Sequence, residues 1–194
     1  MKNKYDIPSG RKIIFSCRNF EPLYRIDRLI RAVKEVIKKD KNILVLIAGS
    51  GSLENNLKKL CRDNGLEDYI RFLGKIEYTQ IPDYHFISDV YVSTSTSDGV
   101  SSSNMEALLS YSIPILSNIP ASRLLVKDAV NGYIFENSYL DLSSKILSAL
   151  EDLEKAPLAY LEINREFSKK FYSWNKNVSD MENLFIKAIE DFKK

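Results

Sequence analysis

The sequence predicts a doubly wound α/β domain built around a parallel sheet. Short apolar segments alternate with longer segments whose apolar residues recur every three to four positions, the pattern of strands alternating with helices. The segment 42–48, NILVLIA, is almost continuously apolar, as expected of a strand that helices cover on both faces. Because right-handed helical crossovers connect such strands, the strands lie parallel and ligands bind beyond their carboxyl ends.

The composition is that of a soluble globular protein. With 194 residues, of which 44% are hydrophobic and 28% charged, the chain can bury a substantial core. A net charge of +2 gives no support for a nucleic-acid partner. Two cysteines, Cys17 and Cys61, are too few for a disulfide framework or a metal cluster, so we expect a reducing compartment, the cytoplasm. The sequence shows neither an apolar run long enough to span a membrane nor a signal-peptide core.

Three strands and two helices are expected in the first part of the chain. The strands are predicted at 12–16, 42–48 and 69–73. Apolar residues at helical spacing predict a helix over 27–39. A second helix follows the segment 42–48 and ends near Gly65, a residue type that suits a helix C-terminus.

The alternation continues through the rest of the chain. Pro82 is expected to open a short helix that ends at Ile87. The remaining strands are predicted at 90–92, 113–116 and 133–135, the last of them after a turn at Asn131 and Gly132. The remaining helices are expected around Glu106 and over 121–128, 140–150, 161–171 and 174–192.

The segment 89–117 carries most of the chemistry. A loop rich in serine and threonine, 93–103, contains Asp98 and Gly99 and leads from a buried strand into a short helix. Backbone amides at a helix start attract anions, and small side chains let a ligand approach the backbone. The carboxylates of Asp98 and Glu106, eight positions apart, suit hydroxyl groups rather than phosphate. Together these features indicate a ligand that carries both phosphate and hydroxyl groups.

Three simpler interpretations of this segment stay open at the level of sequence. A serine-rich run can be a linker, although strand and helix patterns adjoin this one on both sides. Ser103 and Glu106 fit a capping box, in which the glutamate only accepts a hydrogen bond from a backbone amide. Asp98 and Gly99 also form a common turn dipeptide.

Four polar or glycine-containing segments directly follow predicted strands. They are Arg18, the turn from Gly49 to Gly51, the pair Gly74 and Lys75, and the loop 93–103. Since the carboxyl ends of parallel strands lie along one edge of the sheet, we expect these segments to converge on one crevice.

Taken in order, these residues resemble the C-terminal, donor-binding domain of retaining glycosyltransferases with the GT-B fold, often called glycosyltransferase group 1. The similarity covers nearly the whole chain, and its strength lies in the order of the motifs, since no single motif is specific. The motifs are Ser16-Cys17-Arg18, Gly49-Ser50-Gly51, the segment 65–74 (GLEDYIRFLG), the segment 88–92 (SDVYV), Asp98 and Glu106 with seven residues between them, the segment 112–115 (SIPI), the segment 128–132 (DAVNG) and Tyr172-Ser173-Trp174.

The resemblance implies a Rossmann-like domain that forms one half of a GT-B enzyme, with a nucleotide diphosphate sugar held between the two halves. It implies that Glu106 binds the ribose hydroxyls, while the catalytic candidates Asp98 and Arg18 contact the sugar and the phosphates. Serine amides at the helix start would face the pyrophosphate, and the segment after the third strand would border the base. The implied donor-binding residues are Glu106, Arg25, Gly49, Gly51, Gly74, Lys75, Ile76, Gly99, Ser101, Ser102 and Ser103.

The sequence departs from the family pattern at several of these positions. Asp98 stands in place of a glutamate that is one methylene longer, and Ser50 in place of an acidic residue. Tyr24 aligns with the family's phosphate-binding lysine, so the adjacent Arg25 either supplies that charge or is a solvated residue at a helix start. Arg18 has an alternative role in a surface ion pair.

For two further residues we predict only a position in the fold. We also expect no metal ion and no cofactor. His85 is expected at the surface of its short helix, and Trp174 in the core rather than beneath a ligand. The chain contains no Asp-x-Asp motif or His/Asp constellation that would indicate a metal site.

We therefore expect one domain over 1–194, with terminal helices over 161–192, that binds a nucleotide-sugar donor. The full enzyme would transfer a hexose, with retention of configuration, to a saccharide or lipid acceptor, in the cytoplasm or peripherally at the inner face of the membrane. Its acceptor domain would precede this chain, which is expected to be a truncated domain that is inactive by itself. The alternatives are a nucleotide-sugar epimerase domain and a non-catalytic nucleotide-binding module.

Overall fold

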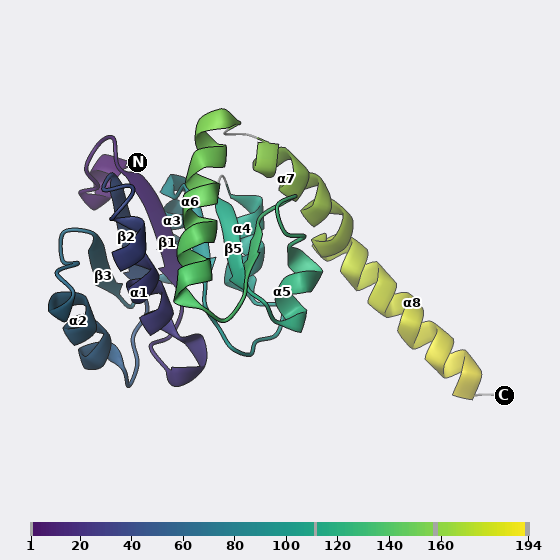
Figure 1. Cartoon of the computed structure of the whole chain (residues 1–194). Coiled ribbons are helices and arrows are strands. Elements are labelled where there is room, and N and C mark those ends of the chain that lie inside the picture. Colours follow the sequence, from purple (N-terminus) through teal and green to yellow (C-terminus); the bar gives the residue numbers. More distant parts are fainter. Residues whose placement is uncertain (1, 111, 157–158, 193–194) are drawn as a thin grey trace.

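The computed structural model, which describes residues 2–110, 112–156 and 159–192, contains a six-stranded sheet (Figure 1). The strand order is β3-β2-β1-β4-β5-β6, and each neighbouring pair is parallel. The predicted doubly wound α/β class is confirmed, and each predicted strand end differs from the structure by at most one residue. The strands are β1 (Lys12–Cys17), β2 (Ile43–Ala48), β3 (Ile70–Gly74), β4 (Val90–Ser93), β5 (Ile113–Ser117) and β6 (Tyr133–Phe135).

The order of the strands places a switch point between β1 and β4. The chain builds outward from β1 to the edge strand β3, then returns to the other side of β1 and continues to β6. Crossovers on the two sides therefore leave in opposite directions, which opens a crevice beyond the carboxyl ends of β1 and β4. Arg18 follows β1 directly and Ser93 ends β4, so both residues lie at this crevice.

Eight helices flank the sheet or extend from it within the described residues. They are α1 (Ile26–Val36), α2 (Glu54–Asp63), α3 (Ile81–Ile87), α4 (Ser102–Leu109), α5 (Pro120–Leu125), α6 (Tyr139–Lys155), α7 (Ala159–Tyr172) and α8 (Trp174–Phe192). Short 3-10 helices precede β1, α1 and α3, at Lys2–Tyr5, Pro22–Tyr24 and Tyr78–Gln80.

The helix predicted over 121–128 begins one residue earlier and ends three residues earlier in the structure. Helix α5 begins at Pro120, whose fixed φ suits a first helical turn. It ends at Leu125 because Asn131 organises the following turn: its amide nitrogen donates to the Leu125 carbonyl at 3.0 Å, and its oxygen accepts from the Lys127 amide at 2.7 Å. These contacts replace the next turn of the helix.

Apolar side chains fill both sides of the sheet. Helices α1, α2 and α6 cover one face, where Ile14, Val45 and Ile47 point from the strands into the core. Helices α3, α4 and α5 cover the other face, where Phe15 and Leu46 are buried. Every residue of β2 is buried, as its continuous apolar run predicts.

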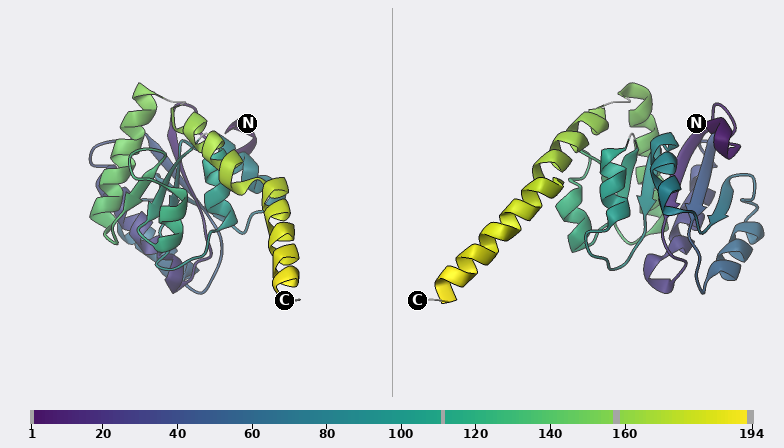
Figure 2. Two further views of the ribbon diagram at one scale, coloured as in Figure 1. Left: turned by 90° about the vertical axis from the view of Figure 1, so that its right-hand side faces the viewer. Right: turned by 180° about the vertical axis from the view of Figure 1, so that it is seen from behind.

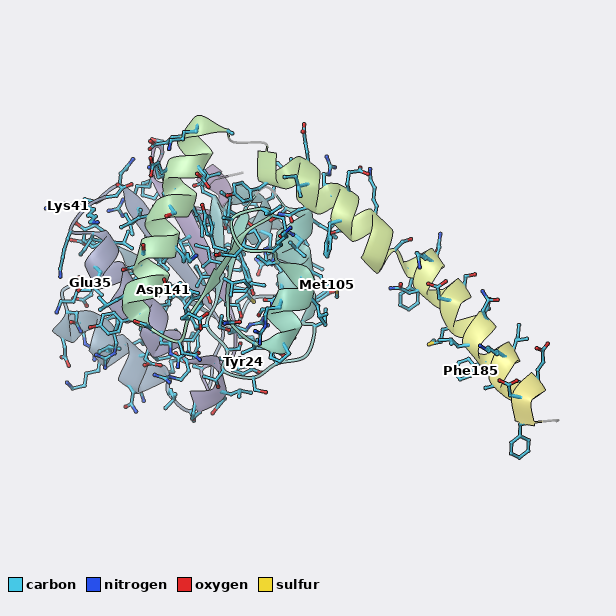
Figure 3. All side chains as sticks on the ribbon, turned by 45° about the vertical axis from the view of Figure 1, so that its right-hand side comes forward. Tyr24, Glu35, Lys41, Met105, Asp141 and Phe185 are labelled. Carbon is cyan, nitrogen blue, oxygen red and sulfur yellow. The ribbon has the colours of Figure 1, made fainter. Side chains whose placement is uncertain are left out.

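Helix α8 projects away from the sheet (Figures 1 and 2). None of its described residues is buried, and its apolar side chains, such as that of Phe185, face solvent far from the rest of the chain (Figure 3). Trp174 is 80% exposed, so its predicted place in the core is wrong. The reason is tertiary: α8 leaves the domain beyond α7, and no sheet or helix face of the described chain covers it. No helix among the described residues has the length and hydropathy needed to cross a bilayer.

Candidate functional site

A pocket of about 380 Å³ lies at the carboxyl ends of the central strands. It brings together residues that follow three different strands and one residue from the start of α4. The convergence expected from the sequence is therefore present in the structure. The lining residues are Cys17, Arg18, Asn19, Tyr24, Gly49, Ser50, Lys75, Ile76, Ile81 and Ser103.

Arg18 is the most firmly held polar side chain of this pocket. Its Nε donates to Ser93 Oγ at 3.0 Å, and its Nη2 donates to Ser101 Oγ at 2.6 Å and to Asn104 Oδ1 at 2.5 Å. These partners come from the end of β4 and the start of α4, so the guanidinium ties the two sides of the switch point together. Only 7% of its side chain is exposed. The three hydrogen bonds offset the free-energy cost of burying the charged guanidinium.

Asp98 lies beside this cation. Its Oδ2 is 3.4 Å from Arg18 Nη2, and its side chain is 21% exposed. Arg18 does form an ion pair, but the pair is largely buried at the crevice and does not lie at the surface, so the interpretation as a surface ion pair is wrong. The loop between β4 and α4 folds back over the strand ends and so delivers the carboxylate to the arginine.

Ser101 is the N-cap of α4. Its backbone is extended, and its Oγ accepts a hydrogen bond from the Asn104 amide at 3.3 Å. The alternative interpretation of Ser103 and Glu106 as a capping box is therefore wrong, because the N-cap of the helix lies two residues earlier than that motif requires. Ser103 instead lines the pocket.

Asn104 is a site residue that the sequence patterns did not reveal. It is almost fully buried, and its side chain joins the cap of α4 to Arg18. The signal was present as a serine followed three residues later by a polar side chain, but the neighbouring Ser103 and Glu106 offered the more familiar pattern.

Glu106 lies one helical turn beyond Ser103 but is not among the residues that line the main pocket. Its carboxylate Oε2 is 3.5 Å from Nε2 of His85, and its side chain is 29% exposed. Both residues line a second, adjacent pocket of about 230 Å³, together with Pro82, Phe86, Leu109 and Ser110.

His85 is buried, with 2% of the residue exposed, so its predicted surface position is wrong. The sequence places it on a short helix, but α3 packs tightly against β1 and β4. The imidazole consequently lies against the rings of Phe15 and Tyr91, with centroid distances of 5.2 and 5.1 Å.

The pKa of the Cys17 thiol depends on its burial and on two nearby charged groups. Burial raises the pKa of its thiol, the Arg18 guanidinium acts in the opposite direction, and the Glu106 carboxylate raises the pKa further. Cys17 itself lines the main pocket.

The two glycines of the Gly49-Ser50-Gly51 turn are required by close packing. A Cβ on Gly49, whose φ is +141°, would fall 2.0 Å from the Arg18 carbonyl oxygen. A Cβ on Gly51 would fall 2.6 Å from the Phe20 carbonyl oxygen. The turn therefore supports the backbone that carries Arg18, and only Gly49 and Ser50 of the three line the pocket.

Other predicted donor-binding residues lie outside the lining of the pocket. Arg25 has a φ of +47° and binds both carboxylate oxygens of Asp27, at 2.9 and 3.1 Å. Its guanidinium is thus engaged locally, whereas the preceding Tyr24 lines the pocket. Gly74 does not line the pocket, although the next residue, Lys75, does. A Cβ added to Gly74 or to Gly99 would have no atom within 4 Å other than those of its own and the adjacent residues. Ser102 opens α4 without lining the pocket.

The arrangement suits an anionic ligand that also offers hydroxyl groups. A helix N-terminus, a buried arginine and Lys75 supply positive potential at one pocket. The carboxylate of Asp98 lies beside Arg18, and that of Glu106 lies in the second pocket. The described residues contain no group of three histidine, cysteine or acidic side chains arranged to hold a metal ion.

The fold is a doubly wound α/β domain with a pocket at the carboxyl ends of its central strands. A sequence model of the family described as glycosyl transferases group 1 matches residues 1–167. The chain belongs to this family, so the family predicted from the sequence is confirmed.

Two curated relatives illustrate the similarity. The alpha-monoglucosyldiacylglycerol synthase of Streptococcus pneumoniae is 26% identical over 150 residues, which are 77% of this chain and 34% of the relative. The poly(ribitol-phosphate) alpha-N-acetylglucosaminyltransferase of Staphylococcus aureus is 31% identical over 73% of this chain and 29% of the relative. The chain thus spans about a third of the length of each.

Solved structures agree on the fold. TarM from Staphylococcus aureus, in a mutant complex with fondaparinux, alpha-GlcNAc-glycerol and UDP, superimposes with a TM-score of 0.82 at 27% identity, over 92% of this chain and 36% of TarM. The C-terminal domain of a group 1 glycosyltransferase (LpcC) from Francisella tularensis has a TM-score of 0.80 at 21% identity, with 89% of this chain and 91% of that domain covered. The second similarity concerns the fold alone.

Proposed function

We propose that this chain binds the nucleotide diphosphate sugar of a retaining glycosyltransferase that transfers a hexose to a saccharide or lipid acceptor. The observation that carries the proposal is the pocket at the switch point, where Arg18, Lys75 and the start of α4 converge. A pyrophosphate is the ligand that most directly matches an arginine, a lysine and free helix-start amides in one cleft.

The ligands and names of relatives support the ligand class. TarM is described in complex with UDP, and the pneumococcal O-GlcNAc transferase GtfA, which is 25% identical with a TM-score of 0.72, is described with UDP and GlcNAc. One curated relative is named as an alpha-monoglucosyldiacylglycerol synthase and the other as a poly(ribitol-phosphate) alpha-N-acetylglucosaminyltransferase.

Within this proposal each polar group has a distinct task. Arg18 and the amides at Ser101, Ser102 and Ser103 bind the pyrophosphate. As the bond to the sugar breaks, negative charge grows on that pyrophosphate, and these donors are already oriented toward it. Glu106 accepts hydrogen bonds from the ribose hydroxyls.

The remaining tasks fall to the edges of the pocket. Asp98 contacts the sugar, and the segment 74–76 borders the base. Gly49, Gly51 and Gly99 contribute through the shape of the backbone, and Arg25 contributes only if it exchanges Asp27 for a phosphate. The acceptor would be held by a separate domain of the full enzyme, acting in the cytoplasm or at the inner membrane face.

Calorimetric titration with UDP, GDP and ADP tests the proposal. We expect a dissociation constant in the micromolar to millimolar range for at least one of them, since the chain supplies only one wall of the site. No binding of any of the three at millimolar concentration would contradict it. If the chain instead binds UDP-sugars and converts one to its epimer without an acceptor, the epimerase alternative is correct.

A further inference from the structure

His85 is a buried polar residue to which the tasks proposed above assign no role. It is the single histidine of the chain and is almost fully buried. Neither of its ring nitrogens forms a hydrogen bond with another described residue. Buried polar groups are nearly always hydrogen-bonded, so an imidazole held in this way requires a reason.

Packing fixes the direction in which the imidazole points. The ring meets Phe15 edge to face and lies tilted against Tyr91, which leaves it little freedom to turn. In this orientation Nε2 faces the carboxylate of Glu106 at 3.5 Å, just beyond the length of a good hydrogen bond. A small movement of the glutamate side chain would complete the bond.

We propose that His85 is a positioning residue for Glu106, donating its Nε2–H to Oε2 so that the other carboxylate oxygen is held toward the ribose. The inference rests on the proposed function of the main pocket. A glutamate has several rotatable bonds, and the adjacent pocket of about 230 Å³ leaves this one room to turn away. A fixed donor beneath the carboxylate removes that freedom before the ligand binds, which strengthens binding.

Three substitutions separate this role from simple packing. His85→Phe keeps an aromatic ring but no donor. His85→Gln places an amide nitrogen near the position of Nε2, whereas His85→Asn places one near Nδ1 instead. Positioning predicts that only the Gln variant retains nearly the nucleotide affinity of the wild type, while a packing role predicts that the Phe variant retains it best.

Titrations with UDP and with inorganic pyrophosphate provide the first test. We expect the Phe and Asn variants to bind UDP about tenfold more weakly than the wild type, and the Gln variant to stay within about threefold. Pyrophosphate, which lacks a ribose, should bind all four proteins within about twofold. Unchanged UDP affinity in the Phe variant, or equal losses for UDP and pyrophosphate, would overturn the inference.

Nuclear magnetic resonance provides a second test that needs no ligand. Because the chain has one histidine, its ring ¹⁵N signals need no assignment and report which nitrogen carries the proton. We expect the Nε2–H tautomer in the wild type and a shift toward a mixture in Glu106→Ala. Identical ring signals in the two proteins would overturn the inference even if every His85 variant failed to fold. If no nucleotide binds the wild type while the ring signals still move, the proposed function fails and the contact between His85 and Glu106 stands.

Discussion

Nη2 of Arg18 lies 3.4 Å from Oδ2 of Asp98 while donating to Ser101 and Asn104. A residue that follows β1 and a residue in the loop after β4 thus share one buried charge pair. The positive potential of the pocket is partly compensated before any ligand binds. An anion that enters must compete with Asp98 for the guanidinium. The effect of Asp98 on the affinity for an anionic ligand can therefore be measured.

Asp98→Asn is expected to tighten binding of a nucleoside diphosphate. Removing the carboxylate leaves Arg18 uncompensated, and a partly screened charge at this distance is worth about 0.5–1 kcal/mol, or roughly two- to fivefold in affinity. Calorimetry with UDP measures the change. Glu151→Gln, at an exposed position on α6 outside the pocket, is the control and should leave the affinity unchanged. Weaker UDP binding in Asp98→Asn would show that the aspartate contacts the nucleotide itself.

Glu106→Gln is expected to weaken UDP binding by about tenfold, because the amide is a poorer acceptor for two ribose hydroxyls than a carboxylate. The loss should vanish with 2′,3′-dideoxy-UDP, which lacks those hydroxyls. Titrating both ligands into both proteins gives the coupling between the carboxylate and the ribose. Equal losses with UDP and with its dideoxy form would rule out the ribose contact.

Arg18→Lys is expected to weaken UDP binding by about tenfold even though the charge is retained. Lysine is a point charge and cannot reproduce the fixed fork that reaches Ser93, Ser101 and Asn104. Arg28→Lys is the matched control, because Arg28 is also largely buried but bonds to Asn137 outside the pocket. Both variants should lose about 1–2 kcal/mol of unfolding free energy, while only the first loses affinity. Similar affinity losses in both would indicate a general effect on the fold.

Tyr91 should make the domain less stable at alkaline pH. Burial raises the pKa of its phenol to about 12, from an ordinary value of 10.0. Between these values the unfolded chain has lost the proton that the folded chain retains, so stability falls as the pH rises from about 10 to 12, by about 2–3 kcal/mol in total. Denaturant unfolding at pH 9 and pH 11 measures the slope.

The tyrosine responsible for that slope can be identified by substitution. Tyr91→Phe should remove this share of the alkaline loss, whereas Tyr78→Phe, at a largely exposed ring, should retain it. An unchanged slope in Tyr91→Phe would assign the effect to other groups.

Removal of residues 174–194 should change the unfolding free energy by less than about 1 kcal/mol, because no described residue of α8 is buried. Ile146→Ala, in the buried face of α6, should cost about 2–5 kcal/mol and serves as the contrasting control. Thermal melts of the three proteins test both statements. A large loss on truncation would show that α8 packs on the domain in solution.

Local pattern and chain topology by themselves determine most of the fold. The six strands follow from short apolar runs, and their parallel order follows from the helical crossovers between them, because both are properties of neighbouring residues. The same topology places Arg18, Gly49 and Lys75 directly after strands, which is why their convergence on one crevice could be predicted.

Contacts between residues far apart in sequence were decided only by the tertiary structure. The cap of α4 lies at Ser101 because its hydroxyl serves both Asn104 and Arg18, a residue 83 positions away. His85 is buried because α3 meets the sheet with that face, and Trp174 is exposed because nothing described covers α8. Periodicity records which face of an element is apolar, but whether another element lies against that face depends on the packing of the whole chain.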